Sequence, residues 1–347
     1  MNALNYSPKD PRAFRGFVEG VQKLNVYLET NNGEQLTQAE NYLTQAIDSD
    51  PRFLPAQYYK SIVLTHARKA DDAIRLLEHL RDENAPFKTE ILYNLAFAYA
   101  KKYKYDSLVK SIGLIREAKD AASSQKRADL VLLSSAIEAW IFAVFAGRSY
   151  DHPDDFDQRK RKYLPEARKI AASVLEDRRL RKLPAETQAA VVVEAHNAAG
   201  IALMRTGQFS SLFPELRDSA WRLSFEHFRS ALSIHPRDVR VLDNLCTLRL
   251  VQASKAIRGG SAELAKQFAI EARDRAVEAI SYNPHDQFRH YRLAQSEYLL
   301  GNLDAAHQAA AQALKEHGEV SESRLRALLS ATNTDNLSLI LDLYPTD

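Results

Sequence analysis

AENYLTQAIDSDP (residues 39–51) shares a spacing pattern with SFEHFRSALSIHP (residues 224–236) and ARDRAVEAISYNP (residues 272–284). Each stretch has small or apolar residues five, eight and twelve positions before its final proline: Ala46, Leu43 and Ala39; Ala231, Phe228 and Ser224; Ala279, Ala276 and Ala272. These spacings place the three residues on one face of an α-helix, where small side chains let a second helix approach closely. Because proline cannot continue a helix, each stretch predicts a helix that ends just before it.

A second kind of helix is indicated by NAAGIALMRTGQF (residues 197–209). Here the small pair Ala199 and Gly200 is followed by Leu203, and Gly207 predicts a left-handed helix stop. Similar patterns occur in LAQSEYLLGNLDAA and YNLAFAYAKKYKY. The two kinds of helix alternate along the chain, which predicts repeated helical hairpins.

The pattern resembles the tetratricopeptide repeat (TPR), W-x2-L-G-x2-Y followed by A-x3-F and P. No unit has the leading Trp, and the Gly occurs once, as Gly200. The resemblance covers nearly the whole chain. It implies an all-α, right-handed α-solenoid of about seven antiparallel hairpins with a short C-terminal helical cap. Pro236 and Pro284 lie further apart than the roughly 34 residues of this repeat.

The predicted hairpins pair 11–30 with 35–49, 55–68 with 70–82, 88–102 with 105–121, 125–146 with 160–177, 185–205 with 214–234, 238–257 with 261–281, and 286–300 with 303–316. Capping helices are expected at 321–331 and 335–343. The predicted divisions are a tail at 1–10, hairpins one to three at 11–124, hairpin four at 125–182, hairpins five to seven at 183–317, and the cap at 318–347. Asp10 is expected to cap the first helix.

Composition supports a helical protein with a continuous core, since 45% of the 347 residues are hydrophobic and only 11 are Gly. The net charge of +2 is too balanced to indicate nucleic acid by itself. Cys246 is the only cysteine, so no intrachain disulfide can form, and its apolar neighbours predict a buried side chain. No signal-peptide pattern is seen at the N-terminus. The stretch 130–146 contains Ser134 and Glu138 and is interpreted as too short and too polar to span a membrane, so a cytoplasmic protein is expected.

In the TPR family, the first helix of each hairpin lines an inner, concave face, and the resemblance implies the same here. The expected groove residues are Tyr58, Tyr59, His66, Tyr93, Asn94, Phe97, Lys101, Asn197, Arg205, Asp243, Asn244, Tyr291, Arg292, Gln295 and Tyr298. Aromatic rings, amides and cations together suit an extended peptide or an amphipathic helix of a partner protein. The alternative is that the rings only fill gaps between helices. The carboxylate clamp of chaperone-binding members is matched only at Asn94 and Lys101, so a cochaperone is not predicted.

A basic block between 159 and 182 offers an alternative function, the binding of nucleic acid. The block contains ten Lys and Arg residues, and those expected to form a basic surface are Arg159, Lys160, Arg161, Lys162, Arg178, Arg179, Arg181 and Lys182. Such a helix is usually only solvated. The acidic loop at 147–157, with His152, motivates a third hypothesis, a small-ligand pocket.

Catalytic and metal-binding patterns are not found in the sequence. His285 and His290 are five residues apart, which rotates them onto different faces of a helix. There is no nucleophile elbow, phosphate loop or dinucleotide fingerprint. No cofactor and no enzymatic activity are therefore expected, and the preferred hypothesis is an adaptor or regulatory scaffold that binds another protein.

Overall fold

The computed structural model describes residues 8–83, 87–147, 155–216, 219–316 and 320–331. Within these ranges the chain forms fifteen α-helices and no β-strand. The helices fall into two compact units, Met1–Ala202 and Leu203–Asp347, and the boundary between them lies inside α9 (Ala185–Gln208). This confirms the predicted all-α fold.

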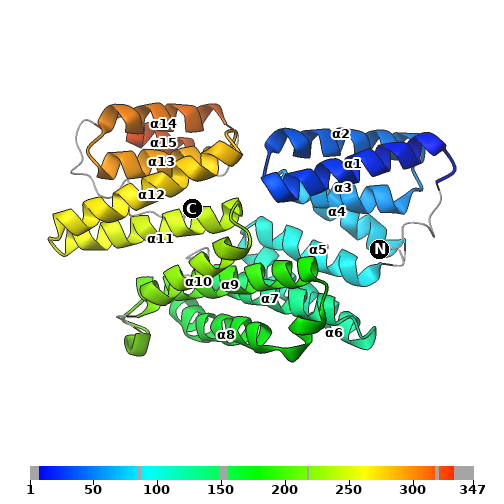
Figure 1. Ribbon diagram of the computed structural model, residues 1–347, viewed down its shortest axis with the longest axis horizontal. Helices are drawn as coiled ribbons and strands as arrows, with labels where there is room; N and C mark the ends of the chain where they lie inside the picture. Colours follow the sequence, from blue (N-terminus) through cyan, green and yellow to red (C-terminus); the bar gives the residue numbers. More distant parts are fainter. Residues whose placement is uncertain (1–7, 84–86, 148–154, 217–218, 317–319, 332–347) are drawn as a thin grey trace. The chain divides into compact units, whose positions relative to one another are not determined.

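The first unit contains four hairpins, in which consecutive helices pack against each other (Figure 1). Its helices are α1 (Pro11–Thr30), α2 (Gly33–Ser49), α3 (Leu54–His66), α4 (Ala70–Asp82), α5 (Lys88–Lys101), α6 (Tyr105–Ser124), α7 (Ala128–Ala146) and α8 (Phe156–Glu176). The short 3-10 helix η3 (Arg178–Lys182) follows and contacts α7 and α8. Asp10 caps α1 as predicted, since its side chain accepts a hydrogen bond from the backbone N–H of Arg12 at 2.8 Å.

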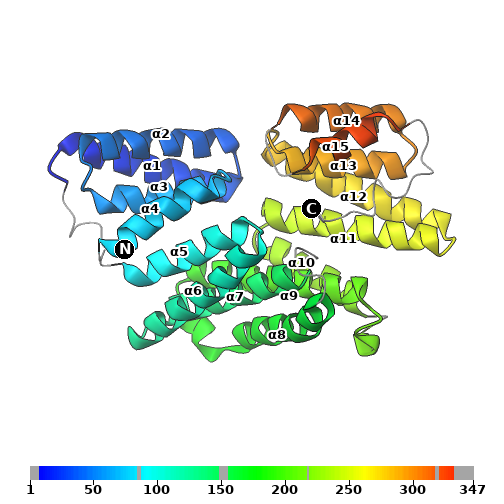
Figure 2. The same ribbon diagram turned by 180° about the vertical axis from the view of Figure 1, so that it is seen from behind.

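The second unit continues the same arrangement after the last residues of α9 (Figure 2). Its elements are η4 (Pro214–Leu216), α10 (Ala220–Ile234), α11 (Val239–Arg258), α12 (Ala262–Tyr282), α13 (Gln287–Leu299), α14 (Leu303–Lys315) and α15 (Glu322–Leu329). The helix α15 packs on α14 and covers the end of the last hairpin. The second predicted capping helix, 335–343, lies outside the described residues.

The residues five, eight and twelve positions before Pro51, Pro236 and Pro284, which we call the proline-phased pattern, form the buried face of α2, α10 and α12. All nine of its residues are at most 2% exposed. Each of the three helices ends two residues before the proline of its pattern. Small and apolar residues at these positions therefore form the contact between helices, as their spacing predicts.

First helices of successive hairpins contact each other directly, in the pairs α1 with α3, α3 with α5, α5 with α7, and α11 with α13. Second helices of neighbouring hairpins, such as α2 and α4, make at most weak contacts within the described residues. Each unit therefore brings its first helices closest together. This agrees with the expectation that the first helices share one face.

Two local predictions were wrong. The helix predicted to start at Pro214 begins only at Ala220, because Pro214 opens the separate 3-10 turn η4. Gly207 is not a left-handed stop, since α9 continues through it. A Cβ at Gly207 would lie 2.2 Å from Nε1 of Trp221, whose indole N–H donates a hydrogen bond to the carbonyl of Met204 at 3.1 Å. The glycine is needed for this close approach of α10. The left-handed glycines observed are Gly260 and Gly301.

The interpretation of 130–146 as too short and too polar for a membrane span also needs correction. The helix α7 has 19 residues and a mean hydropathy of 1.8, and it is long and apolar enough to cross a membrane by those criteria alone. However, 72% of that apolar window is buried inside the protein, as in the core helix of a water-soluble fold. Its one acidic residue in the middle, Glu138, is 3% exposed and accepts hydrogen bonds from Arg116 at 2.8 Å and from Lys119.

Candidate functional site

A row of aromatic rings crosses the first helices of all four hairpins in the first unit. It consists of Tyr27 on α1, His66 on α3, Phe97 on α5 and Trp140 on α7. Successive ring centroids are 5.5, 6.4 and 5.4 Å apart, within the range of favourable ring contacts. His66 and Phe97 remain partly exposed, whereas Tyr27 and Trp140 are 9% and 7% exposed. We call this set the aromatic row.

Lys101 places a positive charge on the aromatic row. It is the last residue of α5, one turn after Phe97. A cation at this position interacts favourably with the negative end of the helix dipole. Its Nζ lies 5.0 Å from the Phe97 ring centroid and 5.3 Å from that of Trp140. The side chain is partly buried and forms no ion pair with any carboxylate in the described part of the chain. The rings hold the ammonium group in place while leaving it available to an anionic group.

Tyr58 and Asn94 serve the packing between hairpins two and three instead. Tyr58 is 6% exposed, and its hydroxyl oxygen accepts a hydrogen bond from Nδ2 of Asn94 at 2.7 Å. Burial raises the pKa of the Tyr58 phenol well above its ordinary value, so it stays neutral. Tyr59 packs edge-on against Phe17 at 5.5 Å, and burial likewise raises its pKa. Tyr93 is partly exposed on α5.

The structure thus brings together the groove residues His66, Phe97 and Lys101, and it adds Tyr27 and Trp140, which the sequence analysis missed. Trp140 lies in the apolar stretch considered for a membrane span, so its place on a first-helix face was not recognised. The chain between successive members of the row varies in length, so a fixed repeat period cannot align them. No simple sequence signal identifies these two positions.

The groove residues expected in hairpins five to seven are mostly buried, which corrects their assignment to an accessible groove. Tyr291, Arg292, Gln295 and Tyr298 are 4%, 1%, 0% and 0% exposed. The guanidinium of Arg292 donates a hydrogen bond to Oε1 of Gln295 at 2.7 Å and lies 4.4 Å from the ring centroid of Phe288. Arg292 and Gln295 are thus joined by a buried hydrogen bond within α13.

Other members of the expected groove are also engaged inside the protein. Asn197 and Arg205 on α9 are 3% and 4% exposed. Asp243 on α11 accepts a hydrogen bond from Nε of Arg289 at 3.3 Å, and Arg289 itself is 5% exposed. Asn244 is partly buried beside Asp243. An accessible groove is therefore supported only for the first unit.

The basic block divides into buried and exposed cations. Arg159 and Lys160 are 4% and 5% exposed, and they pair with Asp155 at 2.7 Å and with Asp157 at 2.9 Å. The Arg159 guanidinium also lies 5.2 Å from the Phe145 ring centroid. These two residues stabilise the start of α8 and do not belong to a basic surface, which corrects that part of the prediction.

The remaining six predicted cations lie in two exposed groups, with the exposed Lys169 and the partly buried Arg168 between them on α8. Arg161 and Lys162 are exposed near the start of α8, whereas Arg178, Arg179, Arg181 and Lys182 are exposed on η3 beyond its end. Along a helix the two groups are separated by about 25 Å. Arg179 is paired with Asp177 at 2.8 Å, and this pair lowers the pKa of the Asp177 carboxyl. The exposed part of the block is thus smaller than the sequence predicts, because Arg159 and Lys160 do not contribute to it.

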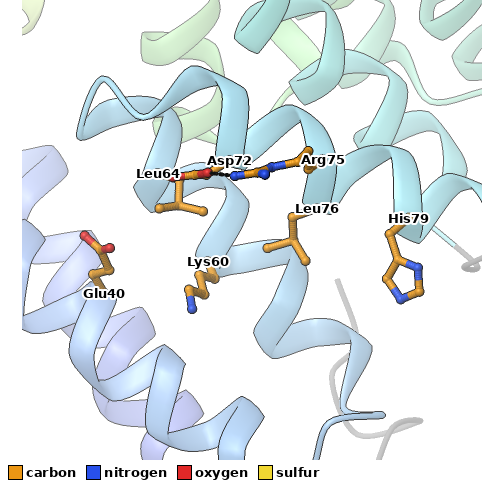
Figure 3. A pocket seen from close by; sticks show the side chains of 7 residues that line it. All are labelled: Glu40, Lys60, Leu64, Asp72, Arg75, Leu76 and His79. Carbon is orange, nitrogen blue, oxygen red and sulfur yellow. Dashed lines mark hydrogen bonds and ion pairs between the residues drawn. The ribbon is translucent and has the colours of Figure 1, made fainter.

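An open depression of about 430 Å³ lies on α2, α3 and α4 (Figure 3). It is lined by Glu40, Lys60, Leu64, Asp72, Arg75, Leu76 and His79. Asp72 and Arg75 pair with each other, and Glu40 pairs with Lys69 at 2.7 Å. The depression is wide open to solvent and lacks the enclosed apolar lining typical of a small-molecule site.

Metal and nucleophile chemistry finds no support in the described ranges. No group of three or more His, Cys, Asp or Glu residues that could hold a metal ion occurs there. Cys246 is 1% exposed, as predicted, and burial raises the pKa of its thiol to about 12. Most of the loop at 147–157, including His152, lies outside the described residues.

No family model matches the sequence, and no curated protein matches it. Similar solved structures include the apo form of the quorum sensor NprR from B. thuringiensis, with 12% identity, a TM-score of 0.47 and 86% of each chain covered. A human IFIT1 dimer with PPP-AAAA has 16% identity and a TM-score of 0.40, covering 93% of this chain and 72% of that chain. The APC/C hetero-tetramer Cut9-Hcn1 has 11% identity and a TM-score of 0.20, covering 89% and 79%.

These values are too low to transfer any partner or activity to this chain. The fold itself rests on its own helices, which pair in order along each unit and bury the proline-phased pattern of small and apolar residues. The chain is therefore an all-α protein built of successive antiparallel helical hairpins.

Proposed function

We propose that this protein is a non-enzymatic binding scaffold that holds a segment of another protein on the aromatic row of its first unit. The observation that carries the proposal is Lys101, a partly buried cation held over Phe97 and Trp140 with no carboxylate of its own among the described residues. A bound segment supplies the missing negative charge.

The chemistry of the row indicates what such a segment contains. Partly exposed rings of His66 and Phe97 offer apolar contact to side chains of the partner. The ammonium of Lys101 favours a carboxylate, from Asp, Glu or a chain terminus, and a charged hydrogen bond of this kind contributes about 1.5–3 kcal/mol. The expected ligand is therefore a peptide with an apolar residue and a carboxylate a few residues apart.

Two other parts of the proposal rest on the sequence. A protein of 347 residues with a single, deeply buried cysteine is suited to a reducing compartment, so we place it in the cytoplasm. The regulatory or adaptor role follows from holding a partner without transforming it. Nucleic acid binding is not favoured, because two cations of the basic block, Arg159 and Lys160, are buried and paired with carboxylates.

The test uses a phage-displayed library of 12-residue peptides selected on the full-length protein. The affinity of synthetic selected peptides is then measured by isothermal titration calorimetry with wild type and with Lys101→Gln. We expect peptides enriched in Asp or Glu beside an apolar residue, and a roughly tenfold weaker affinity for the variant.

The matched control is Lys88→Gln, which removes an exposed cation from the other end of α5. It should leave the affinity within about twofold, because Lys88 is not over the aromatic row. Selected peptides that lack carboxylates, or that bind both variants equally, would contradict the proposal.

A further inference from the structure

The outer face of α1 carries a largely apolar stripe whose side chains are exposed or only partly buried among the described residues. Its members are Phe14, Val18, Val21, Asn25 and Leu28, with the alternating spacing of four and three residues that two packed helices require. Phe14 and Leu28, near the two ends of the stripe, are each 43% exposed. Val18 and Val21 are only partly buried against the core of the first hairpin.

The stripe is centred on a different face of α1 from the one that packs into the first hairpin, and only Val18 and Val21 reach the edge of that core. The residues that pack into the first hairpin include Ala13, Phe17, Leu24 and Tyr27, and all are at most 9% exposed. The stripe lies about a quarter-turn of the helix away from them. Its size and regular spacing indicate a surface for another helix.

One edge of the stripe bears a row of exposed polar residues seven positions apart, Arg15, Gln22 and Glu29. Arg15 and Glu29 lie about 21 Å apart along the helix, so they cannot pair with each other within one chain. Neither forms an ion pair with a described residue. The row has opposite charges at its two ends and an amide in its centre.

We propose that α1 pairs with α1 of a second copy of this chain, in an antiparallel orientation centred near Val21 and Gln22. In that arrangement Phe14 faces Leu28 of the other copy, and the two Val21 side chains meet. The polar row of each copy lies beside that of the other, so Arg15 meets Glu29 at both ends.

The self-complementary charge pattern selects this occupant. A two-fold rotation places Glu29, Gln22 and Arg15 of the second copy opposite Arg15, Gln22 and Glu29 of the first. Both Arg15–Glu29 ion pairs therefore form at once, and the two Gln22 amides face each other. A parallel pairing sets Phe14 against Phe14 and places the two polar rows on opposite edges, where the charges do not meet. Asn25, a polar residue within the stripe, further restricts the register.

The test is sedimentation equilibrium of the full-length protein between about 1 and 200 µM. We expect a monomer–dimer equilibrium within this range, since one helix pair is a small interface. Leu28→Lys should weaken dimerisation at least tenfold. Val277→Lys is the matched control, since Val277 on α12 is 51% exposed but lies outside the stripe, and it should leave the equilibrium unchanged.

A charge swap tests orientation and partner together. Arg15→Glu alone and Glu29→Arg alone should each weaken the dimer about threefold to tenfold, because like charges then meet across the interface. The double variant R15E/E29R should return to within about twofold of wild type. Circular dichroism confirms that each variant keeps its helical content.

Three results would overturn the proposal. The first is a wild-type monomer throughout the concentration range. The second is a dimer that is insensitive to Leu28→Lys or that the double swap does not restore. The third is a monomer that dimerises only after residues 1–7 are removed, which would identify that segment as the occupant of the stripe.

Discussion

The first helices of the two units use cations in opposite ways. In the first unit, Lys101 lies over two aromatic rings and has no carboxylate partner among the described residues. In the second unit, Arg289 pairs with the carboxylate of Asp243, and the buried Arg292 donates a hydrogen bond to the neutral amide of Gln295. The same type of helix therefore yields a binding face in one unit and a stabilising network in the other. Four predictions test this contrast, from the largest expected effect to the smallest.

The reactivity of the buried Cys246 thiol measures how often the second unit opens to solvent. Because burial raises the pKa of its thiol from 9.0 to about 12, the thiolate fraction at neutral pH falls by roughly a thousandfold. Alkylation by iodoacetamide should therefore be at least that much slower in the folded protein than in urea. Mass spectrometry of the labelled protein measures both rates. Rapid labelling without denaturant would show that the second unit opens readily.

Arg292→Ala should destabilise the second unit by about 2–4 kcal/mol, because it removes a buried side chain together with its hydrogen bond to Gln295 and its contact with the Phe288 ring. Urea denaturation followed by circular dichroism measures the loss. Lys101→Gln provides the comparison and should lower the free energy of unfolding by only about 0.5–1 kcal/mol, through the loss of its cation–π contacts. If both variants lose equal stability, the proposed difference between the units is wrong.

Gly207→Ala should cost about 1–3 kcal/mol, since the added methyl group overlaps the Trp221 indole. The change should also shift the tryptophan fluorescence. The matched substitution is Gly113→Ala on α6, where no atom lies within 4 Å of the added Cβ. There the helix should gain about 0.5–1 kcal/mol, because alanine restricts the unfolded chain. Equal effects at both sites would contradict the packing described for α9 and α10.

His227 on α10 should give the second unit a modest pH dependence. Burial lowers its pKa below the ordinary value, so the unfolded chain binds the proton more readily than the folded one. Its contribution is complete above the unfolded pKa of about 6.5 and is lost as the pH falls through the folded pKa. Urea titrations at pH 8 and pH 5 measure the change, and His227→Gln should reduce it. An unchanged slope in the variant would rule out this residue as the cause.

Sequence patterns predicted the helices well where local chemistry determines them. The limits of α4 at Ala70 and Asp82 were correct, with its acidic residues in the first turn. The start of α10 was wrong because Pro214 is compatible with either a helix start or a 3-10 turn, and only the surrounding structure selects the latter.

The candidate site was predicted less completely. Phe97 and Lys101 lie one helical turn apart, so their common face follows from the sequence. Trp140 joins them only through the packing of α7 on α5, and the repeats differ too much in length to show this. Conversely, Arg292 and Gln295 satisfy the same spacing rule as surface residues, and their burial depends on side chains that lie far away in the sequence.

The carboxylate of Glu138 has a consequence for synthesis of the chain. The ribosome makes α6, with Arg116 and Lys119, before it makes α7, so both cations are available when the most apolar helix emerges. Neutralisation of this charge does not have to wait for α8 or for anything further downstream. Because translation runs from the N- to the C-terminus, Arg116 and Lys119 are made before α7, the helix whose length and apolar composition would also suit insertion into a membrane.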